Sequence, residues 1–219
     1  MVSLNAKERM LHRAAKDIEA GMIVNLGIGL PTQVANYLPD GFPVCLHSEN
    51  GIAGVGPQAA IGSADRNLID AGGAYITPIK GTSYFDSAVS FAIVRSGRLD
   101  LTMLGAFQVS ANGDLANWII PGFFTPGAGG AIELAQKARK VAVITTHTDK
   151  KGRPKILHEC TLPLTAAACV SRIYTDMAVI DVTPNGLQLI EIARGIDVDE
   201  VVKATGTELH LPTGEIPTF

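Results

Sequence analysis

The chain has 219 residues, of which 47% are hydrophobic and 18% are charged, and its formal net charge is -3. This length suffices for one well-buried core, so the composition predicts a single α/β domain over residues 1–219. The basic residues are scattered and the aromatic content is 5%. These two features exclude the clustered basic face and the stacking platforms of a nucleic-acid-binding protein.

Several features of the sequence indicate where in the cell the protein is expected. No apolar run reaches membrane-spanning length, and residues 1–19 lack the continuous apolar segment of a secretory signal. The three cysteines, Cys45, Cys160 and Cys169, are too widely spaced for a disulfide framework or a zinc site. We therefore expect a cytoplasmic protein without a bound metal, in which each cysteine is a small buried apolar side chain.

Strand-like and helix-like segments alternate along the chain and are separated by glycine-containing turns. In chain order, the pattern predicts a helix at 5–20, a strand at 22–26, a short helix at 31–37, strands at 43–47 and 74–79, a helix at 86–96, strands at 99–105 and 106–109, a helix at 131–138, strands at 140–146 and 187–193, and a helix at 198–205. Residues 152–160 and those from 211 onward are expected to form loops or a tail. The alternation predicts a mainly parallel sheet with helices on both faces.

A Gly-x-Gly turn, Gly27-Ile-Gly29, joins the first predicted strand to the helix that begins at Pro31. Strand, glycine turn and helix form a phosphate-binding arrangement in principle. The dinucleotide fingerprint, however, requires a third glycine three residues later and an acidic residue about 20 positions further on. The third glycine is missing here, which excludes a dinucleotide cofactor at this turn.

The most informative segment is Ser48-Glu-Asn-Gly51, which follows a short apolar run and opens a glycine-rich stretch. An acidic residue at the carboxyl end of a strand lies where open α/β sheets bind ligands. A partly desolvated carboxylate there can act as a covalent nucleophile. Alternatively, Ser48 or Glu49 caps a helix at a strand-to-helix turn. Spacing alone favours this capping role.

Several motifs, taken together and in their order along the chain, favour the nucleophile over the helix cap as the role of Glu49. They are Asn25-Leu-Gly-Ile-Gly-Leu-Pro31, His47-Ser-Glu-Asn-Gly-Ile52, Leu104-Gly-Ala-Phe-Gln108, Gly113-Asp-Leu-Ala-Asn-Trp118, Ile120-Pro-Gly122 and Gly129-Gly-Ala131. Together they closely resemble the β (B) subunit of class I coenzyme A transferases of the 3-oxoacid, acetate/acetoacetate and 3-oxoadipate types. The resemblance extends from Met22 to Gly206. It implies a three-layer α/β sandwich of the kind shared with ribose-5-phosphate isomerase.

The resemblance also implies a chemistry and a set of site residues. Glu49 would be the nucleophile of a ping-pong reaction through a glutamyl-CoA thioester, and Gly130 would donate its N–H to the oxyanion. The substrate-binding residues would be Asn25, Asn50, Gly51 and Gly129. Coenzyme A would be a substrate, with no permanently bound cofactor, and an α (A) subunit would complete an α2β2 enzyme. Two alternatives are an acyl-CoA hydrolase on the same scaffold and a non-catalytic ligand-sensing module.

The substrate expectation depends on where cations lie. Residues 77–85 would lie near the acyl end in relatives, and their single cation is Lys80. Many relatives carry lysines where this chain has Phe123-Phe-Thr-Pro-Gly-Ala-Gly-Gly130, which leaves Arg95 as the one nearby cation in the sequence. Because a second carboxylate needs a fixed cation, we expect acetoacetate or acetate rather than a dicarboxylate.

Other polar side chains in these segments are expected to have structural roles. His47 precedes the nucleophile, but the implied reaction needs no general base at that step. His147 and His158 are expected at loops or edges, and Trp118 in the core beside the site. Gln108 and Asn117 are candidate donors around the site, with packing the stronger expectation.

Overall fold

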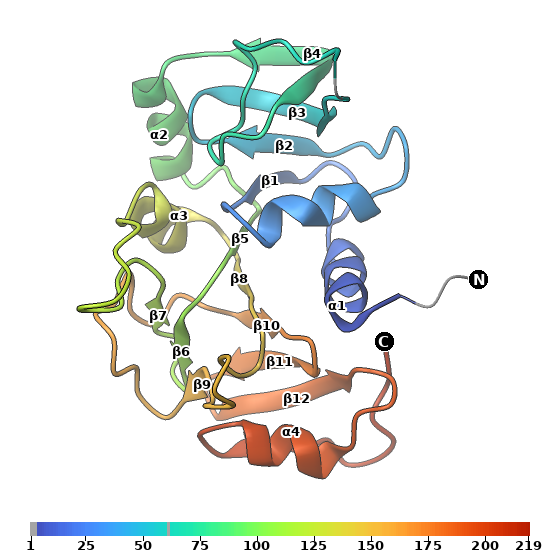
Figure 1. Ribbon diagram of the computed structural model, residues 1–219, viewed down its shortest axis with the longest axis vertical. Helices are drawn as coiled ribbons and strands as arrows, with labels where there is room; N and C mark the ends of the chain where they lie inside the picture. Colours follow the sequence, from blue (N-terminus) through green and yellow to red (C-terminus); the bar gives the residue numbers. More distant parts are fainter. Residues whose placement is uncertain (1–3, 61) are drawn as a thin grey trace.

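The computed structural model describes residues 4–60 and 62–219 and has three layers (Figure 1). A ten-stranded sheet runs through the middle in the order β13-β12-β11-β10-β8-β5-β1-β2-β3-β4. Its strands are β1 (Ile23–Leu26), β2 (Cys45–Ser48), β3 (Ile52–Gln58), β4 (Ile76–Tyr84), β5 (Leu101–Leu104), β8 (Val141–Ile144), β10 (Arg172–Tyr174), β11 (Ala178–Thr183), β12 (Gly186–Ile192) and β13 (Leu209–His210).

A second, three-stranded sheet and five helical segments complete the described part of the chain. The small sheet has the order β7-β6-β9. These elements are β6 (Gln108–Ser110), β7 (Leu115–Ala116), β9 (Ile156–Leu157), α1 (Ala6–Ala15), the 3-10 helix η1 (Pro31–Tyr37), α2 (Ser87–Arg95), α3 (Ala131–Lys137) and α4 (Val198–Ala204).

The central strands of the large sheet are parallel. Strand β1 pairs in parallel with β2 and β5, β5 with β8, and β8 with β10. The flanks are mainly antiparallel, because β2, β3 and β4 form one meander and β10, β11 and β12 another, while the edge strand β13 pairs in parallel with β12. The predicted parallel sheet is therefore confirmed for the centre, and the antiparallel flanks are additions that the sequence pattern did not reveal.

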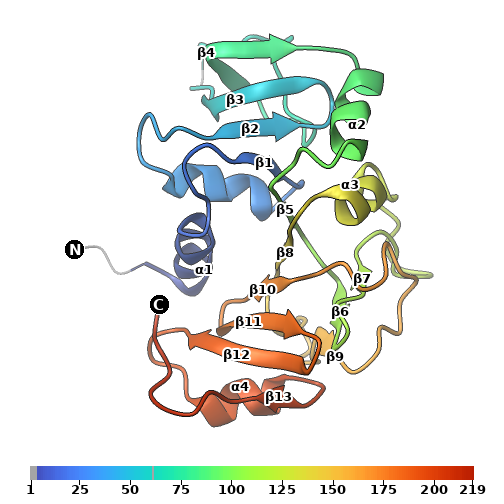
Figure 2. The same cartoon turned by 180° about the vertical axis from the view of Figure 1, so that it is seen from behind.

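Strand β8 shows how the layers are held together. Its residues alternate between two apolar clusters, Val141 and Val143 in one and Ala142 and Ile144 in the other. The first cluster includes residues of α2, α3 and the small sheet, and the second includes residues of α1 and η1. This period of two, with both faces apolar, is typical of a strand buried between two layers. Figure 2 shows the same layers from behind.

Helix α1 is shorter than predicted. Asn5 accepts the N–H of Glu8 while the Glu8 carboxylate accepts the N–H of Asn5, which forms a capping box at the first turn. The helix ends at Ala15 rather than residue 20, because the chain tightens into turns there. Asp17, two residues beyond the end of the helix, accepts hydrogen bonds from Arg13 and from Arg172 on β10.

Other boundaries also differ from the sequence predictions. The segment at 31–37 is a 3-10 helix rather than an α-helix, and the expected loop at 152–160 contains β9. The structure extends the strand predicted at 74–79 as far as Tyr84. Strands β3, β7, β10, β11 and β13 were not predicted. In the described part of the chain, none of the helices has the length and apolar character that spanning a membrane requires.

Candidate active site

The turn between β2 and β3 carries Glu49, and its shape depends on Gly51. The Gly51 N–H donates to the Ser48 carbonyl at 3.0 Å, and Gly51 has φ +118°. A Cβ at this position would lie 1.9 Å from the carbonyl oxygen of Phe85. Only glycine fits both the positive φ and this close approach. The alternative interpretation, in which Ser48 or Glu49 caps a helix, is thus wrong: the chain turns from one strand directly into the next.

Asn50 and Gly51 were expected to bind substrate, and the structure gives both other partners. The Asn50 side chain is exposed and donates its Nδ2 hydrogen to the carbonyl of Ile69 at 2.8 Å. The carbonyl of Gly51 accepts the N–H of Phe85 at 3.0 Å. Both residues therefore fix the turn to neighbouring loops, as Asn and Gly commonly do in turns.

Glu49 meets the start of α3 across 81 residues of sequence. The Gly130 N–H donates to Glu49 Oε1 at 3.3 Å. The Glu49 side chain is half-buried, and this burial raises the pKa of its carboxyl group, while the hydrogen bond from Gly130 partly opposes the rise. Among the described residues Glu49 has no cationic partner, and burial without one leaves an under-solvated carboxylate, which is a reactive state for a nucleophile.

Gly130 leaves no room for a side chain beside this carboxylate. A Cβ at Gly130 would lie 2.8 Å from Glu49 Cδ, 2.8 Å from Oε1 and 2.9 Å from Oε2. Gly130 itself has φ -81° and ψ -3°, a conformation open to any residue. The preceding Gly129 has φ +50°, and a Cβ there would be 4.0 Å from Glu49 Oε1. The absence of a side chain at Gly130 thus serves the contact with Glu49 and not the local backbone.

Both residues border a cavity of about 490 Å³. Gly129 lines it as well, with apolar walls from Ile28, Leu104, Phe107 and Phe124 and polar groups from Asn117, Thr145 and Lys155. Asn117 is held by Gly105, whose carbonyl accepts its Nδ2 hydrogen at 3.0 Å. Glu49 and Lys155 are the charged side chains of this wall among the described residues. The cavity combines a mostly apolar surface with a few placed polar groups, as small-molecule sites do.

Asn25, the fourth expected substrate-binding residue, lies beneath the turn and outside the cavity lining. It is 1% exposed, its Nδ2 group donates to the His47 carbonyl at 3.2 Å, and its Oδ1 accepts from Thr102 at 3.3 Å. These neighbours follow from the sheet register, which places Asn25 opposite His47 on β2 and Thr102 on β5. The structure thus places Asn25 below Glu49, where its hydrogen bonds join β1, β2 and β5.

The histidines differ in their surroundings. His47 is buried, its Nε2 lies 3.0 Å from Ser90 Oγ, and burial lowers its pKa to about 4, consistent with the predicted structural role. His147, expected at a loop or edge, is instead fully buried with 2.9 Å contacts to Thr175 and Thr205. Burial lowers its pKa to about 4 as well. His147 does lie in a loop, as predicted, but its burial was not foreseen because the two hydroxyl partners lie far away in the sequence.

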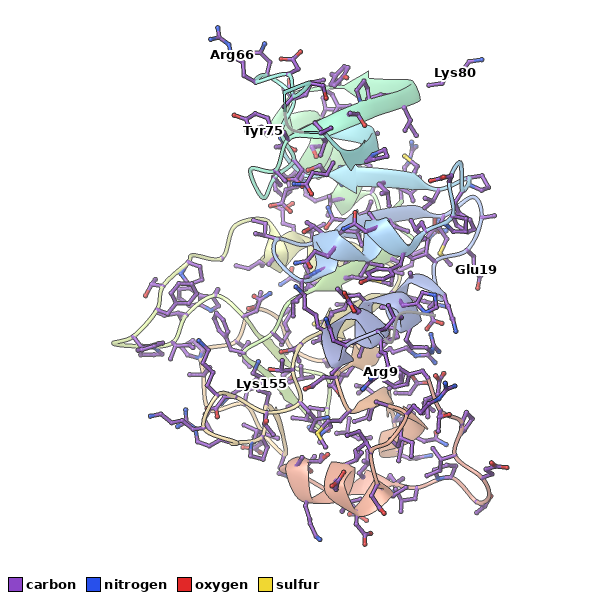
Figure 3. The ribbon with its side chains drawn as sticks, turned by 45° about the vertical axis from the view of Figure 1, so that its right-hand side comes forward. Arg9, Glu19, Arg66, Tyr75, Lys80 and Lys155 are labelled. Atoms are coloured by element: carbon purple, nitrogen blue, oxygen red, sulfur yellow. The ribbon has the colours of Figure 1, made fainter. Side chains whose placement is uncertain are left out.

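The cations named from the sequence lie away from the cavity. Arg95 forms an exposed ion pair with Glu133 at 2.8 Å between α2 and α3. Lys80 is exposed on β4, and Figure 3 shows it projecting from the outer edge of the sheet, whereas Lys155 lies in the middle of the molecule. None of residues 77–85 belongs to the described cavity lining. The position of Lys155 in the cavity was not predicted, because its segment contains polar residues, a glycine and a proline, which are typical of a loop.

The remaining expectations concern packing around the site. Gln108 accepts the N–H groups of Thr161 and Leu162 through Oε1, outside the cavity. Trp118 is half-buried and donates Nε1–H to the Leu164 carbonyl. All three cysteines are free and half-buried, whereas full burial was expected. In residues 4–60 and 62–219, no three His, Cys, Asp or Glu side chains gather closely enough to hold a metal.

Comparisons with known proteins agree on one family. Residues 7–204 match the family model described as Coenzyme A transferase. The B subunit of 3-oxoadipate CoA-transferase from Pseudomonas putida is 51% identical over 205 residues, which cover 93% of this chain and 96% of that protein. The B subunit of succinyl-CoA:3-ketoacid coenzyme A transferase from Helicobacter pylori is 45% identical over 205 residues, with 94% and 99% covered. The beta subunit of acetate CoA-transferase from Escherichia coli is 45% identical, with 90% of each chain covered.

Solved structures share the fold at low sequence identity. An acyl-CoA transferase of Escherichia coli O157:H7, determined as a thioester complex with CoA, superimposes with a TM-score of 0.77 at 20% identity. The alignment covers all of this chain and 44% of that one, so this chain spans less than half of that protein. Glutaconate coenzyme A-transferase from Acidaminococcus fermentans gives a TM-score of 0.71 at 16% identity, with 95% and 86% covered. With the family model and the B and beta relatives, these findings show that the chain belongs to the coenzyme A transferase family.

Proposed function

We propose that this chain is the β subunit of an enzyme that moves coenzyme A from an acyl-CoA to a short carboxylic or 3-oxo acid through a glutamyl-CoA thioester at Glu49. The observation that carries the proposal is the half-buried Glu49 carboxylate, held by the Gly130 N–H at 3.3 Å on the wall of a mostly apolar cavity. Coenzyme A is a substrate in this reaction, and the protein supplies the nucleophile.

The reaction has two chemical steps in each direction. The Glu49 carboxylate attacks the thioester carbonyl of the acyl-CoA, the C–S bond breaks, and an acyl-glutamyl anhydride and CoA thiolate result. The thiolate then attacks the glutamyl carbonyl, and the acyl carboxylate leaves with its electron pair. A second acid reverses both steps and departs as its CoA ester. Only a carboxylate nucleophile gives an anhydride that can become a thioester, and neither step requires a proton.

Gly130 would stabilise the second tetrahedral intermediate. Its N–H already faces Glu49 Oε1 in the free protein. When the thiolate adds to the glutamyl carbonyl, negative charge develops on that oxygen, and the same N–H can compensate it. A donor of this kind is typically worth about 3 kcal/mol in the transition state.

Exposed apolar side chains at the mouth of the cavity are consistent with a partner protein that covers it. Phe123 is 86% exposed, Ile28 62% and Phe124 50%, and the last two line the cavity. An exposed apolar surface beside a site that must exclude water fits a second protein surface that covers it. The relatives named above are themselves B or beta subunits. We therefore propose that the partner is an α (A) subunit, in an α2β2 assembly.

The test is a transfer assay on the isolated chain and on the chain co-expressed with an α (A) subunit. We expect transfer only from the complex. Borohydride reduction after exposure to acyl-CoA, followed by peptide mass spectrometry, should mark Glu49. Full activity of the isolated chain would contradict the partner. Loss of thioester without any acceptor acid would indicate a hydrolase, and thermal stabilisation by acyl-CoA without turnover would indicate a ligand sensor.

A further inference from the structure

A lysine shares the cavity wall with the nucleophile. Lys155 is half-buried and lines the same cavity as Glu49. Its backbone is fixed on both sides: its N–H donates to the His147 carbonyl at 3.0 Å, and its carbonyl accepts the N–H of Val109 at 2.9 Å. The side chain therefore starts from a rigid strand entry and not from a freely moving loop.

Two hydroxyl groups orient the ammonium. Lys155 Nζ donates to Thr145 Oγ1 at 3.0 Å and to Thr146 Oγ1 at 2.8 Å. Each hydroxyl gives its own hydrogen to a backbone carbonyl, Thr145 to Ala106 and Thr146 to Thr148. Both oxygens can then only accept from the lysine. Because an ammonium has three N–H donors, one remains for a ligand.

This ammonium has no counter-ion among the described residues. No carboxylate lies within ion-pair distance of Nζ: Asp149 is paired with Arg153 instead, and Asp176 accepts the N–H of His147. Burial lowers the pKa of Lys155 below its usual value, since the charged form is poorly solvated there, while the more distant charges of Asp176 and Asp149 partly oppose this shift. Glu49 and Lys155 line one cavity without pairing with each other. The space between them is thus bounded by a carboxylate nucleophile and an unpaired cation.

We propose that Lys155 is a specificity-determining residue. It binds the second oxygen-bearing group of the acid substrate, while the carboxylate at the other end of the acid reacts at Glu49. This inference depends on the proposed transferase function. The second group is a distal carboxylate or a 3-oxo carbonyl, both of which accept a hydrogen bond from an ammonium. Apolar walls at Leu104, Phe107 and Phe124 suit the carbon chain between the two groups.

The inference changes the substrate expectation drawn from the sequence. Acetate was included because the sequence offered only Lys80 and Arg95 as cations near the acyl end. The structure moves Arg95 to the surface and brings Lys155 into the cavity. Leaving a half-buried cation without its ligand is unfavourable, so a site built this way discriminates against acids that lack the second group. We therefore expect acetoacetate and dicarboxylates to be preferred over acetate and butyrate.

The test uses the αβ complex and compares wild type with Lys155→Met, which keeps the apolar stem and removes the charge. With one acyl-CoA donor, kcat/KM is measured for succinate, 3-oxoadipate, acetoacetate, butyrate and acetate. We expect a loss of about 10- to 100-fold for wild type's preferred acids with a second oxygen group, and a change within about threefold for butyrate and acetate. Lys155→Arg should retain part of the preference, and Lys150→Met, an exposed lysine in the same segment, should match wild type.

The five acids also show whether Lys155 binds a carbonyl or a carboxylate, and they separate the role of Lys155 from the transferase function. A selective loss with acetoacetate against butyrate assigns the carbonyl, and one with succinate assigns the carboxylate. An equal loss with all five acids would overturn the inference, because it would place Lys155 on coenzyme A or in the folding of the site. A wild type without any preference for acids with a second group would overturn it too. Failure of the transferase function would instead appear as a wild-type complex without transfer, or as full activity in Glu49→Gln.

Discussion

Replacing Gly130 by alanine tests how the position of the Glu49 carboxylate affects the proposed transfer reaction. The added Cβ would lie 2.8 Å from Glu49 Cδ, whereas non-bonded carbon atoms rest about 3.5–4.0 Å apart. The carboxylate must therefore move by about 0.7 Å or more. A misplacement of about 1 Å at a reacting group can cost about 100-fold in rate. We expect Gly130→Ala to lower kcat/KM by roughly 10- to 100-fold.

The fold should tolerate this substitution, which separates position from stability. Gly130 has φ -81° and ψ -3°, and alanine at such a site typically stabilises a protein by about 0.4–1 kcal/mol through the unfolded chain. The assay is steady-state transfer by the complex, with thermal unfolding measured in parallel. Gly105→Ala adds the same methyl group to the same cavity, but no heavy atom lies within 4 Å of it. Wild-type kinetics in Gly130→Ala, or equal losses in both variants, would refute the reasoning.

Two further predictions concern titration. Glu49→Gln should abolish transfer and raise the Tm at neutral pH, because burial raises the pKa of Glu49 and its ionised form is a cost to the folded state. That gain in Tm should shrink as the pH falls through the raised pKa, where wild-type Glu49 becomes protonated; a gain independent of pH would argue against a desolvated carboxylate. His47 and His147 are neutral in the folded protein, with pKa values lowered from 6.5 to about 4. Their contribution to stability is complete above pH 6.5 and should be lost as the pH falls to about 4, up to about 3 kcal/mol each. Urea unfolding across this range measures the loss, and a flat profile would contradict it.

The centre of the fold was predictable because its strands are apolar on both faces. Runs such as 22–26, 99–105 and 140–146 match β1, β5 and β8, which lie side by side in the sheet. Strand β3 was hidden by its Gly54, Gly56 and Pro57, residues that usually interrupt strands. The structure explains these glycines: a Cβ at Gly56 would lie 2.5 Å from the carbonyl oxygen of Thr77 on β4. The close approach of a later strand cannot be deduced from the local sequence.

The sequence named two residues, Glu49 and Gly130, that meet in the folded chain, but it did not foresee what surrounds them. Spacing alone left Glu49 as a candidate helix cap, and the family motifs singled out Glu49 and Gly130 from opposite parts of the chain. Neighbouring motif residues were then expected to bind substrate, but Asn50 is bonded to a backbone carbonyl outside the cavity. Lys155 was missed for the opposite reason: its position depends on Thr145 and Thr146, whose hydroxyls lie ten and nine residues earlier and meet it only in the folded chain.

Buried polar groups beneath the turn between β2 and β3 explain how the short strand β2 can hold the Glu49 carboxylate in place. Asn25 Nδ2 lies 3.3 Å from His47 Nδ1 and can only donate, so His47 Nδ1 accepts. Because burial keeps His47 neutral, its proton is then on Nε2, which donates to Ser90 Oγ at 3.0 Å. This chain of contacts connects β1, the end of β2 and helix α2, three separate elements. Glu49, two residues beyond His47, thus extends from a base with little freedom, while its carboxylate faces the cavity.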